Sequence, residues 1–315
     1  MPGILTFGET MGLVRASDLG GWETVSNAQV SIGGADSNVA IGLRRLGVDA
    51  AWVGRVGDDA LGRRVEREIR AEGVRTRAVV DPDRPTGLML KERRTPTHSR
   101  VSFYRSDSAG SRLRADDIRD EDIATADVVL VNGVTASLSE SAQNATLSVL
   151  ERARRLGTTI AFDVNHRASL WVDRDPHPLY HRIASHADLV FAGDDEARLV
   201  TGAILQTPEA VATAVADLGP SEVVLKNGAA GARSLVDGRL FRREAIPITP
   251  VDTVGAGDAF VAGYLAARLD GASVDDRLRM GVRCGAFACL SPGDWEGLPR
   301  RSDLRLLEAA DPVER

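Results

Sequence analysis

The sequence has 315 residues, of which 43% are hydrophobic, enough for a sizeable core and one large domain. A net charge of -6 and the lack of a basic face argue against nucleic-acid binding, although a locally positive site can still bind an anionic substrate. The N-terminal stretch is too short and polar for a signal peptide, and no apolar run is long enough to span a bilayer. We therefore expect a cytoplasmic protein with no membrane contact.

Short apolar runs rich in β-branched residues alternate with longer helical patterns along the chain. The expected strands are Ile4–Phe7, Ala51–Val56, Val128–Val131, Ile160–Asp163, Leu189–Ala192 and Val223–Lys226. The expected helices are Ser37–Leu46, Ala60–Ala71, Ser141–Arg155, Leu179–Ser185, Pro208–Leu218 and Ala259–Leu269. This alternation predicts an α/β protein, a single domain over residues 1–315 with a mainly parallel sheet and helices on both faces.

Two regions, Met11–Ile32 and Thr86–Tyr104, lack helical periodicity and interrupt this alternation. Apolar segments in the second region look like antiparallel strands, and the polar Arg93–Thr97 between them is typical of a loop tip. We interpret residues 11–32 and 86–105 as a small inserted β-sheet that acts as a lid, with an ordinary edge hairpin as the alternative. Pairing two such lids across a two-fold axis would satisfy their unpaired edges, which predicts a homodimer.

The strongest signal is the string Asp252–Phe260, DTVGAGDAF, just before an apolar helical stretch. Small residues at 255–257 let the backbone approach a ligand closely, and a helix start offers free N–H groups to anions. A carboxylate beside phosphate is unfavourable because like charges repel, so Asp258 is expected to have a chemical role there. The role that fits is accepting a proton from an attacking hydroxyl. The alternative is an ordinary helix start with Asp258 as a partner of the helix dipole.

A second motif, GGADSNVA at Gly33–Ala40, continues into LRRLG at residues 43–47. Together with DTVGAGDAF it resembles the two signatures of the ribokinase, or PfkB, family of carbohydrate kinases, and the resemblance extends over nearly the whole chain. It implies a ribokinase-like three-layer α/β/α sandwich, with ATP and Mg²⁺ as cofactors and a sugar or sugar acid as substrate. The dinucleotide fingerprint G-x-G-x-x-G is absent after the first strand, which argues against a nicotinamide-dependent enzyme.

The resemblance also assigns roles to residues at the transferred phosphate and the nucleotide. It makes Asp258 the catalytic base and places the γ-phosphate in an anion hole formed by Gly255, Ala256 and Gly257. Its nucleotide-binding positions correspond to Asn165, Lys226, Gly228, Gly231 and Cys284. A plain hairpin turn at 226–231 and a helix-core role for Cys284 are the alternatives.

A magnesium motif of the family, Asn-x-x-Glu, reads Gly193-Asp194-Asp195-Glu196 in this chain. Glu196 is kept and the asparagine is replaced. The resemblance therefore implies that Glu196 helps to organise the magnesium shell without being a direct ligand. The two cysteines, Cys284 and Cys289, are too few for a disulfide framework or a zinc site.

On the sugar side, the resemblance assigns Gly33, Gly34, Asn38, Asp258 and Asp294 to substrate binding, with Gly33–Gly34 as a simple tight turn being the alternative. Tyr104–Leu113, YRSDSAGSRL, and Gly293–Pro299, GDWEGLP, resemble the 2-keto-3-deoxygluconate kinases of the family.

Arg105 and Arg167 are further substrate candidates, because two guanidinium groups favour a carboxylate-bearing sugar. The alternative is that each arginine lies on the surface or on the nucleotide side, where Arg167 would bind ATP. Tyr104 is a substrate candidate from the resemblance of Tyr104–Leu113. Met89 and Phe103 replace tyrosines of those relatives, which keeps fructokinase or another sugar kinase open. A non-catalytic sugar or nucleotide sensor on the same fold is the remaining alternative.

Overall fold

The computed structural model describes residues 3–95 and 98–308. Its main sheet contains β1 (Ile4–Phe7), β4 (Ala50–Gly57), β5 (Arg75–Asp81), β8 (Val128–Asn132), β9 (Thr159–Asp163), β10 (Leu189–Ala192), β11 (Glu222–Lys226), β12 (Ala232–Val236) and β13 (Arg239–Arg243). The strand order is β13-β12-β11-β10-β9-β8-β1-β4-β5. Neighbours from β11 to β5 are parallel, whereas β11–β12 and β12–β13 are antiparallel.

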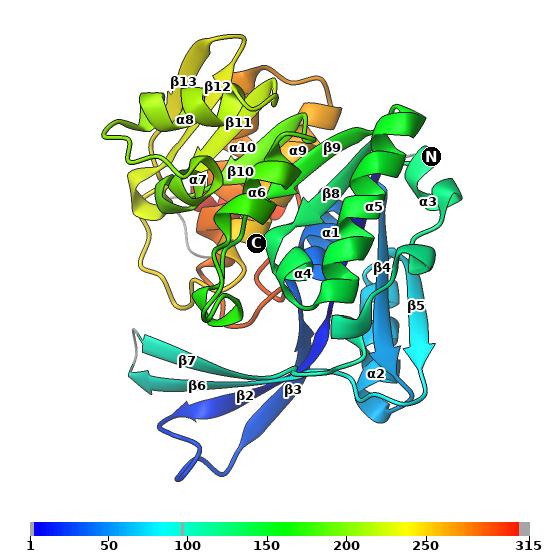
Figure 1. The fold of residues 1–315 in the computed structure, drawn as a ribbon. Helices are drawn as coiled ribbons and strands as arrows, with labels where there is room; N and C mark the ends of the chain where they lie inside the picture. Colours follow the sequence, from blue (N-terminus) through cyan, green and yellow to red (C-terminus); the bar gives the residue numbers. More distant parts are fainter. Residues whose placement is uncertain (1–2, 96–97, 309–315) are drawn as a thin grey trace.

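Helices cover both faces of this sheet (Figure 1). One layer holds α1 (Ala35–Arg45), α2 (Ala60–Ala71), α9 (Ala256–Leu269) and α10 (Val274–Ala288). The other holds α3 (Asp120–Ala124), α4 (Gly133–Ser137), α5 (Glu140–Leu156), α6 (His177–Ala184), α7 (Asp194–Thr201) and α8 (Pro208–Ala216). Short 3₁₀ turns are η1 (Gly110–Arg112), η2 (Ala115–Asp117), η3 (Ala168–Leu170), η4 (Gly228–Ala230) and η5 (Asp303–Leu307).

The two hydrophobic clusters follow from the alternation of side chains along each buried strand. Leu130 and Leu189 join the cluster beneath α1 and α9, whereas Val129 and Val190 point to the opposite cluster beneath α5 and α8. Continuous apolar runs are required because both faces of these strands are covered. The three-layer α/β/α architecture expected from the sequence is confirmed.

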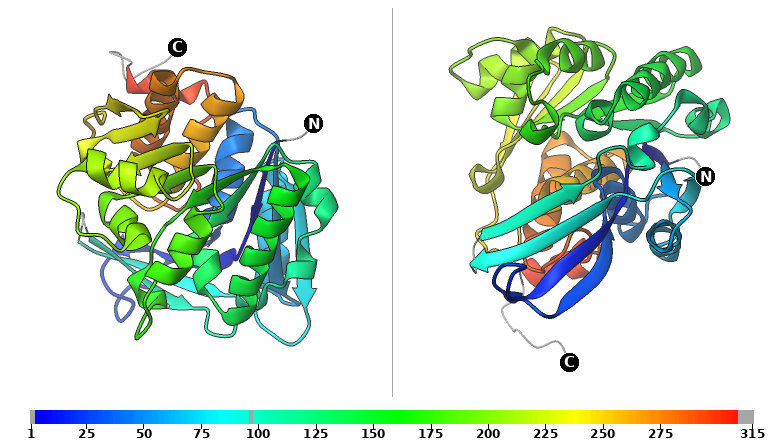
Figure 2. Two further views of the ribbon diagram at one scale, coloured as in Figure 1. Left: turned by 45° about the horizontal axis from the view of Figure 1, so that its top comes forward. Right: turned by 60° about the horizontal axis from the view of Figure 1, so that its bottom comes forward.

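A second, small sheet stands away from the main one, and Figure 2 shows it from two further sides. It consists of β2 (Met11–Leu19), β3 (Ala28–Gly33), β6 (Leu88–Thr95) and β7 (His98–Tyr104), in the order β3-β2-β6-β7. The two hairpins are antiparallel, as expected, but β2 and β6 run parallel to each other. Met11, Leu13 and Met89 form a separate apolar cluster on this sheet.

Several elements differ from the sequence expectation. Arg93–Thr95 continue β6 and pair with β7 instead of forming a loop. Polar residues are compatible with a strand here because this end of the hairpin is largely exposed. Pro96 and Thr97 of the expected tip lie outside the described residues. The sequence analysis also missed β5, α7 and the β12–β13 hairpin, whose turn uses Asp237 and Gly238 at φ 49° and 71°. Within 3–95 and 98–308, no helix is long and apolar enough to cross a membrane. Both cysteines are free thiols.

Candidate active site

The glycine-rich turn leads directly into α9, at the carboxyl ends of the parallel strands. Gly255 caps the helix with φ 79°, in the left-handed region that favours glycine. A Cβ at this position would lie 2.0 Å from the backbone oxygen of Asp294, so no larger residue fits. The first turn of α9 therefore presents its N–H groups and the positive end of its dipole at a closely packed junction, which suits an anion.

Asp258 lies in that first turn and is only 8% exposed. The Nδ2 of Asn38, on α1, donates a hydrogen bond to its Oδ2 over 2.8 Å. Burial raises the pKa of Asp258 to about 7, against the lowering effect of the Asn38 bond, and the nearby Asp163 carboxylate adds to the rise. A carboxylate with a pKa near neutrality is suited to accept a proton from a hydroxyl.

A cavity of about 590 Å³ lies on one side of the turn, between the small sheet and the main body. We call it the first cavity. The lining contains these residues predicted to contact substrate: Gly34, Asn38, Arg105, Arg167, Asp258 and Asp294. The structure thus brings together side chains from both signature motifs, from the end of β7 and from the loop after β9.

Gly33 does not line this cavity, but it makes room for a residue that does. A Cβ on Gly33 would lie 2.2 Å from Oδ2 of Asp294 and 2.6 Å from Cε of Met89. Burial raises the pKa of Asp294 to about 6, with Lys91 acting in the opposite direction. Gly33 therefore acts through the close approach of Asp294, and the prediction of a direct sugar contact at Gly33 needs this correction.

Tyr104 also needs correction, because it lies outside the first cavity and is 62% exposed. Side chains alternate along β7, so Val101 and Phe103 face the cavity and Tyr104 faces away. Arg105, which directly follows the end of the strand, does reach the cavity.

Arg105 is held by a buried carboxylate that the sequence analysis missed. Its Nε and Nη2 lie 2.7 Å and 2.5 Å from Oε2 of Glu9, and the hydroxyl of Ser108 donates to Oε1 of Glu9. The guanidinium also lies 5.7 Å from the centre of the Phe103 ring. Arg105 is therefore fixed in position, and part of its charge is balanced before any substrate binds.

Asp36 is a second missed residue of the first cavity. It is 2% exposed, and its Oδ2 accepts a hydrogen bond from the hydroxyl of Thr135 over 2.8 Å. Burial raises the pKa of this carboxyl to about 8. Glu9 carries no motif signal that separates it from surface carboxylates, so sequence alone could not have found it. Asp36 lies inside the signature motif Gly33–Ala40, a signal that the sequence analysis passed over.

A second cavity of about 560 Å³ lies on the other side of the turn, and its lining is largely apolar. Of the residues predicted to contact nucleotide, Lys226, Gly228, Gly231, Ala256 and Gly257 line it. The sequence analysis missed the lining segment 245–248, which carries no glycine-rich motif. Nζ of Lys226 forms an ion pair with Oδ1 of Asp163 over 2.6 Å, which keeps this ammonium at the inner end of the cavity.

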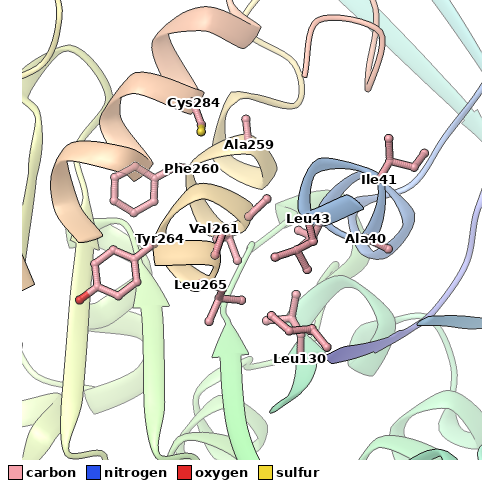
Figure 3. Close-up of a cluster of buried hydrophobic side chains, with 14 of the residues drawn as sticks. Ala40, Ile41, Leu43, Leu130, Ala259, Phe260, Val261, Tyr264, Leu265 and Cys284 are labelled. Atoms are coloured by element: carbon pink, nitrogen blue, oxygen red, sulfur yellow. The ribbon is translucent and has the colours of Figure 1, made fainter. Parts of the chain in front are cut away.

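Cys284 was expected to contact the nucleotide, but it lies in the hydrophobic core, as in the alternative given above. Figure 3 shows Cys284 on α10 pointing toward α9, within the hydrophobic core. A Cβ on Gly263 of α9 would lie 2.7 Å from its Sγ. Cys289, five residues later, lines the second cavity instead.

Asn165, Arg167 and Glu196 lie near the strand ends that separate the two cavities. Asn165 is buried at φ 39° and lines neither cavity, whereas Arg167 is exposed and faces the first one. Both oxygens of Glu196 accept backbone hydrogen bonds of 2.7 Å, from His166 and from Gly193. Glu196 is thereby fixed, and Gly193, which replaces the asparagine of the family motif, contributes only its backbone.

No group of three metal-ligating side chains exists among residues 3–95 and 98–308. Oδ2 of the fully buried Asp163 has no hydrogen-bond partner, and the Glu196 carboxylate lies close enough to raise the pKa of Asp163. Two carboxylates beside an ammonium fit a divalent cation that is bound mainly by phosphates and water.

Comparison with known proteins agrees with this arrangement. Residues 1–301 match the profile of the pfkB family carbohydrate kinases. The chain is 37% identical to 2-dehydro-3-deoxygluconokinase of Bacillus subtilis (strain 168), covering 95% of this chain and 93% of that protein. It is 30% identical to 2-dehydro-3-deoxygalactonokinase of Haloferax volcanii, covering 98% and 97%.

Solved structures resemble the fold over almost its full length. A PfkB protein from Polaromonas sp. JS666 superposes with a TM-score of 0.87 at 33% identity, covering 97% of this chain and 99% of that one. A putative ribokinase II from E. coli, solved with ATP and Mg²⁺, has a TM-score of 0.89 at 23% identity, covering 98% and 99%. Since both signature motifs meet where the two cavities adjoin and the family profile spans nearly the whole sequence, the chain belongs to the pfkB family of carbohydrate kinases and is an ATP-dependent sugar kinase.

Proposed function

We propose that the chain transfers the γ-phosphate of MgATP to a hydroxyl of 2-keto-3-deoxygluconate, also named 2-dehydro-3-deoxygluconate. The observation that carries this proposal is that Asp258 lines the first cavity together with Arg105 and Arg167, while the preceding Ala256 and Gly257 line the second. Guanidinium groups bind carboxylates with paired hydrogen bonds, which favours a sugar acid over a neutral sugar. Relatives named for this substrate and for its galactose analogue support the same choice.

In the proposed mechanism, the sugar occupies the first cavity and ATP the second. A sugar hydroxyl loses its proton to the Asp258 carboxylate as its oxygen forms a bond to the γ-phosphorus. The bond between that phosphorus and the β,γ-bridging oxygen breaks, and ADP leaves with the electron pair. The backbone amides of 255–257 and the Lys226 ammonium hold the transferring group in place.

Magnesium supplies charge neutralisation on the ATP phosphates when it is bound. Asp163 and Glu196 are the side chains that would face its water shell. Burial raises the pKa of Asp163, and the paired Lys226 ammonium acts in the opposite direction.

The sugar side of the site also favours a second candidate, a kinase of neutral sugars such as fructose. Met89 and Phe103 present no hydroxyl to the first cavity, and Arg105 is already paired with Glu9. Both features weaken recognition of an acid. Arg167 is then the main group left to bind a substrate carboxylate, although its charge also acts on Asp163 and Asp258.

A screen of ATP consumption separates these candidates. The panel contains 2-keto-3-deoxygluconate, its galactose epimer, fructose, ribose and a nucleoside, each with and without magnesium. We expect the highest kcat/KM for a keto-deoxy sugar acid and no turnover without the divalent cation. Preference for fructose would reject the sugar-acid proposal, and turnover of none of the sugars would favour a sensor.

We also propose that the small sheet is a lid and that two lids pair in a homodimer. Exposed apolar side chains on its strands, Leu19, Val30 and Tyr104, support an interface on this sheet. Closure would exclude water from the first cavity and limit ATP hydrolysis. Since ATP is the donor in this reaction, we place the enzyme in the cytoplasm. A monomer by sedimentation at micromolar concentration would reject the dimer.

A further inference from the structure

Lys91 is a fully buried lysine on strand β6 of the small sheet. Its Nζ lies 2.5 Å from Oδ2 of Asp252, which is itself 6% exposed and begins the glycine-rich string. The same Nζ lies 3.4 Å from the backbone oxygen of Gly293. An ion pair this deeply buried needs each of its partners, because removing one leaves an uncompensated charge.

Asp252 joins three segments of the site through this one carboxylate. Its Oδ1 accepts a hydrogen bond from the backbone of Val254 over 3.2 Å, inside the glycine-rich turn. Its Oδ2 accepts from the backbone of Gly293 over 3.3 Å, next to the substrate candidate Asp294. Lys91 therefore connects the small sheet to the turn at the start of α9 and to the loop that carries Asp294.

The rarity of lysine in the whole sequence also draws attention to Lys91. Only two of the 39 lysine and arginine residues are lysines, Lys91 and Lys226. Lys91 is fully buried and Lys226 is partly buried; both are paired with carboxylates, and they line the first and second cavities respectively. The ammonium of lysine is a compact point charge, unlike the planar guanidinium of the arginines that the chain otherwise uses.

We propose that Lys91 is a positioning residue for phosphoryl transfer, whose ammonium locks the small sheet to the glycine-rich turn through Asp252. The small sheet then encloses the sugar in the same step in which the backbone amides of the glycine-rich turn are aligned with the phosphate. A purely structural pair would stabilise the fold without any preference for the transition state. The inference rests on the proposed phosphoryl transfer to a sugar, and it assigns no group to the reacting atoms.

Kinetics of Lys91→Met provide the first test. Because small misplacements at a reacting centre reduce turnover strongly, we expect kcat to fall about 100-fold. KM should change little, as for an interaction realised mainly in the transition state. The share of ATP hydrolysed without transfer should rise. Arg94→Met is the matched control on the same strand: its pair with Glu23 is exposed, so its removal should leave kcat unchanged.

Chemical rescue of Lys91→Ala extends this test to variants of lower stability. Ethylammonium or propylammonium should restore part of kcat by filling the vacated slot beside Asp252, whereas the same salts should not affect wild type. A folded Lys91→Met with wild-type kcat and the wild-type ratio of transfer to hydrolysis would overturn the proposal. Absence of transfer by the wild type itself would instead reject the proposed function.

Amine labelling followed by mass spectrometry gives a readout independent of turnover. Lys91 is inaccessible while the pair is formed, so its modification rate reports separation of the small sheet from the turn. We expect Asp252→Asn to increase that rate, and ATP with a bound sugar to slow it in wild type. A rate at Lys91 that responds to neither change would contradict the proposed lock, whatever the sugar specificity proves to be.

Discussion

The side-chain amide of Asn38, on α1, donates a 2.8 Å hydrogen bond to the carboxylate of Asp258, on α9. The two residues belong to different signature motifs, separated by 220 positions. This bond holds the carboxylate in one orientation at the junction of the two cavities. It favours the ionised form of Asp258, while burial favours the neutral form, and the balance leaves the pKa at about 7.

Asp258→Asn is expected to reduce kcat by about 10²–10⁴-fold, the range of a general base. The amide keeps the shape of the side chain but does not accept the proton. ATP binding should persist, since the second cavity is unchanged. Steady-state assays combined with nucleotide titration check both statements. Turnover close to wild type would remove Asp258 from the mechanism.

The pH dependence of kcat/KM should show a limb at about pH 7, with activity rising as pH increases. The direction follows because only the ionised Asp258 accepts a proton. Asn38→Ala removes a bond that stabilises the ionised form, so its limb should move to higher pH. Equal profiles for wild type and this variant would contradict the assigned role of the hydrogen bond.

Asp258→Asn should also raise the melting temperature. The pKa of the carboxyl is raised from 3.8 to about 7 on folding, so its contribution to stability is full below pH 3.8 and is lost as pH rises through 7. Asparagine has no such dependence. The difference in Tm between variant and wild type should therefore grow between pH 5.5 and 8, by about 2–4 °C. Calorimetry at both pH values tests this expectation.

Arg105→Ala should raise KM for 2-keto-3-deoxygluconate more than KM for fructose. The guanidinium faces the first cavity and can meet a carboxylate, whereas a neutral sugar gains less from it. This variant leaves Glu9 buried without its partner. Arg105→Ala combined with Glu9→Gln is therefore the control, and the selectivity change should survive in it. Equal effects on both sugars would reject an acid-reading role.

Gly255→Ala should abolish turnover and destabilise the protein by roughly 1–3 kcal/mol, because it combines an unfavourable backbone conformation with a steric clash. The position has φ 79°, and the new Cβ would lie 2.0 Å from the Asp294 oxygen. Gly238→Ala is the matched control, with φ 71° and open space around it. It should lose some stability and no activity.

The glycine-rich turn, α9 and the buried strands could be predicted from sequence, because local patterns determine them. Asp258 follows three small residues before an apolar helix, and that string has one favourable geometry. Tyr104 was misassigned because the face of the small sheet on which its side chain lies depends on how β7 pairs with β6. Cys284 was misassigned because neighbouring positions on α10 face opposite ways: Cys284 lies in the core, whereas Gly285 lines the second cavity.

The ion pairs of the site could not be predicted. Glu9 meets Arg105 across 96 positions, and Lys91 meets Asp252 across 161. Neither pair has a local sequence signal, since each forms only when the small sheet docks on the main one. The rarity of lysine in this sequence was a usable hint for Lys91 that motif reading passed over.

The glycine-rich turn and the start of α9 line both cavities. Val254, Gly255 and Asp258 line one side, and Thr253, Ala256 and Gly257 line the other. A bisubstrate inhibitor, an adenosine joined to a sugar acid through a phosphate chain, would therefore have to thread past two glycines to fill both halves. Such a compound would gain the affinity of both ends only if its linker followed this turn closely.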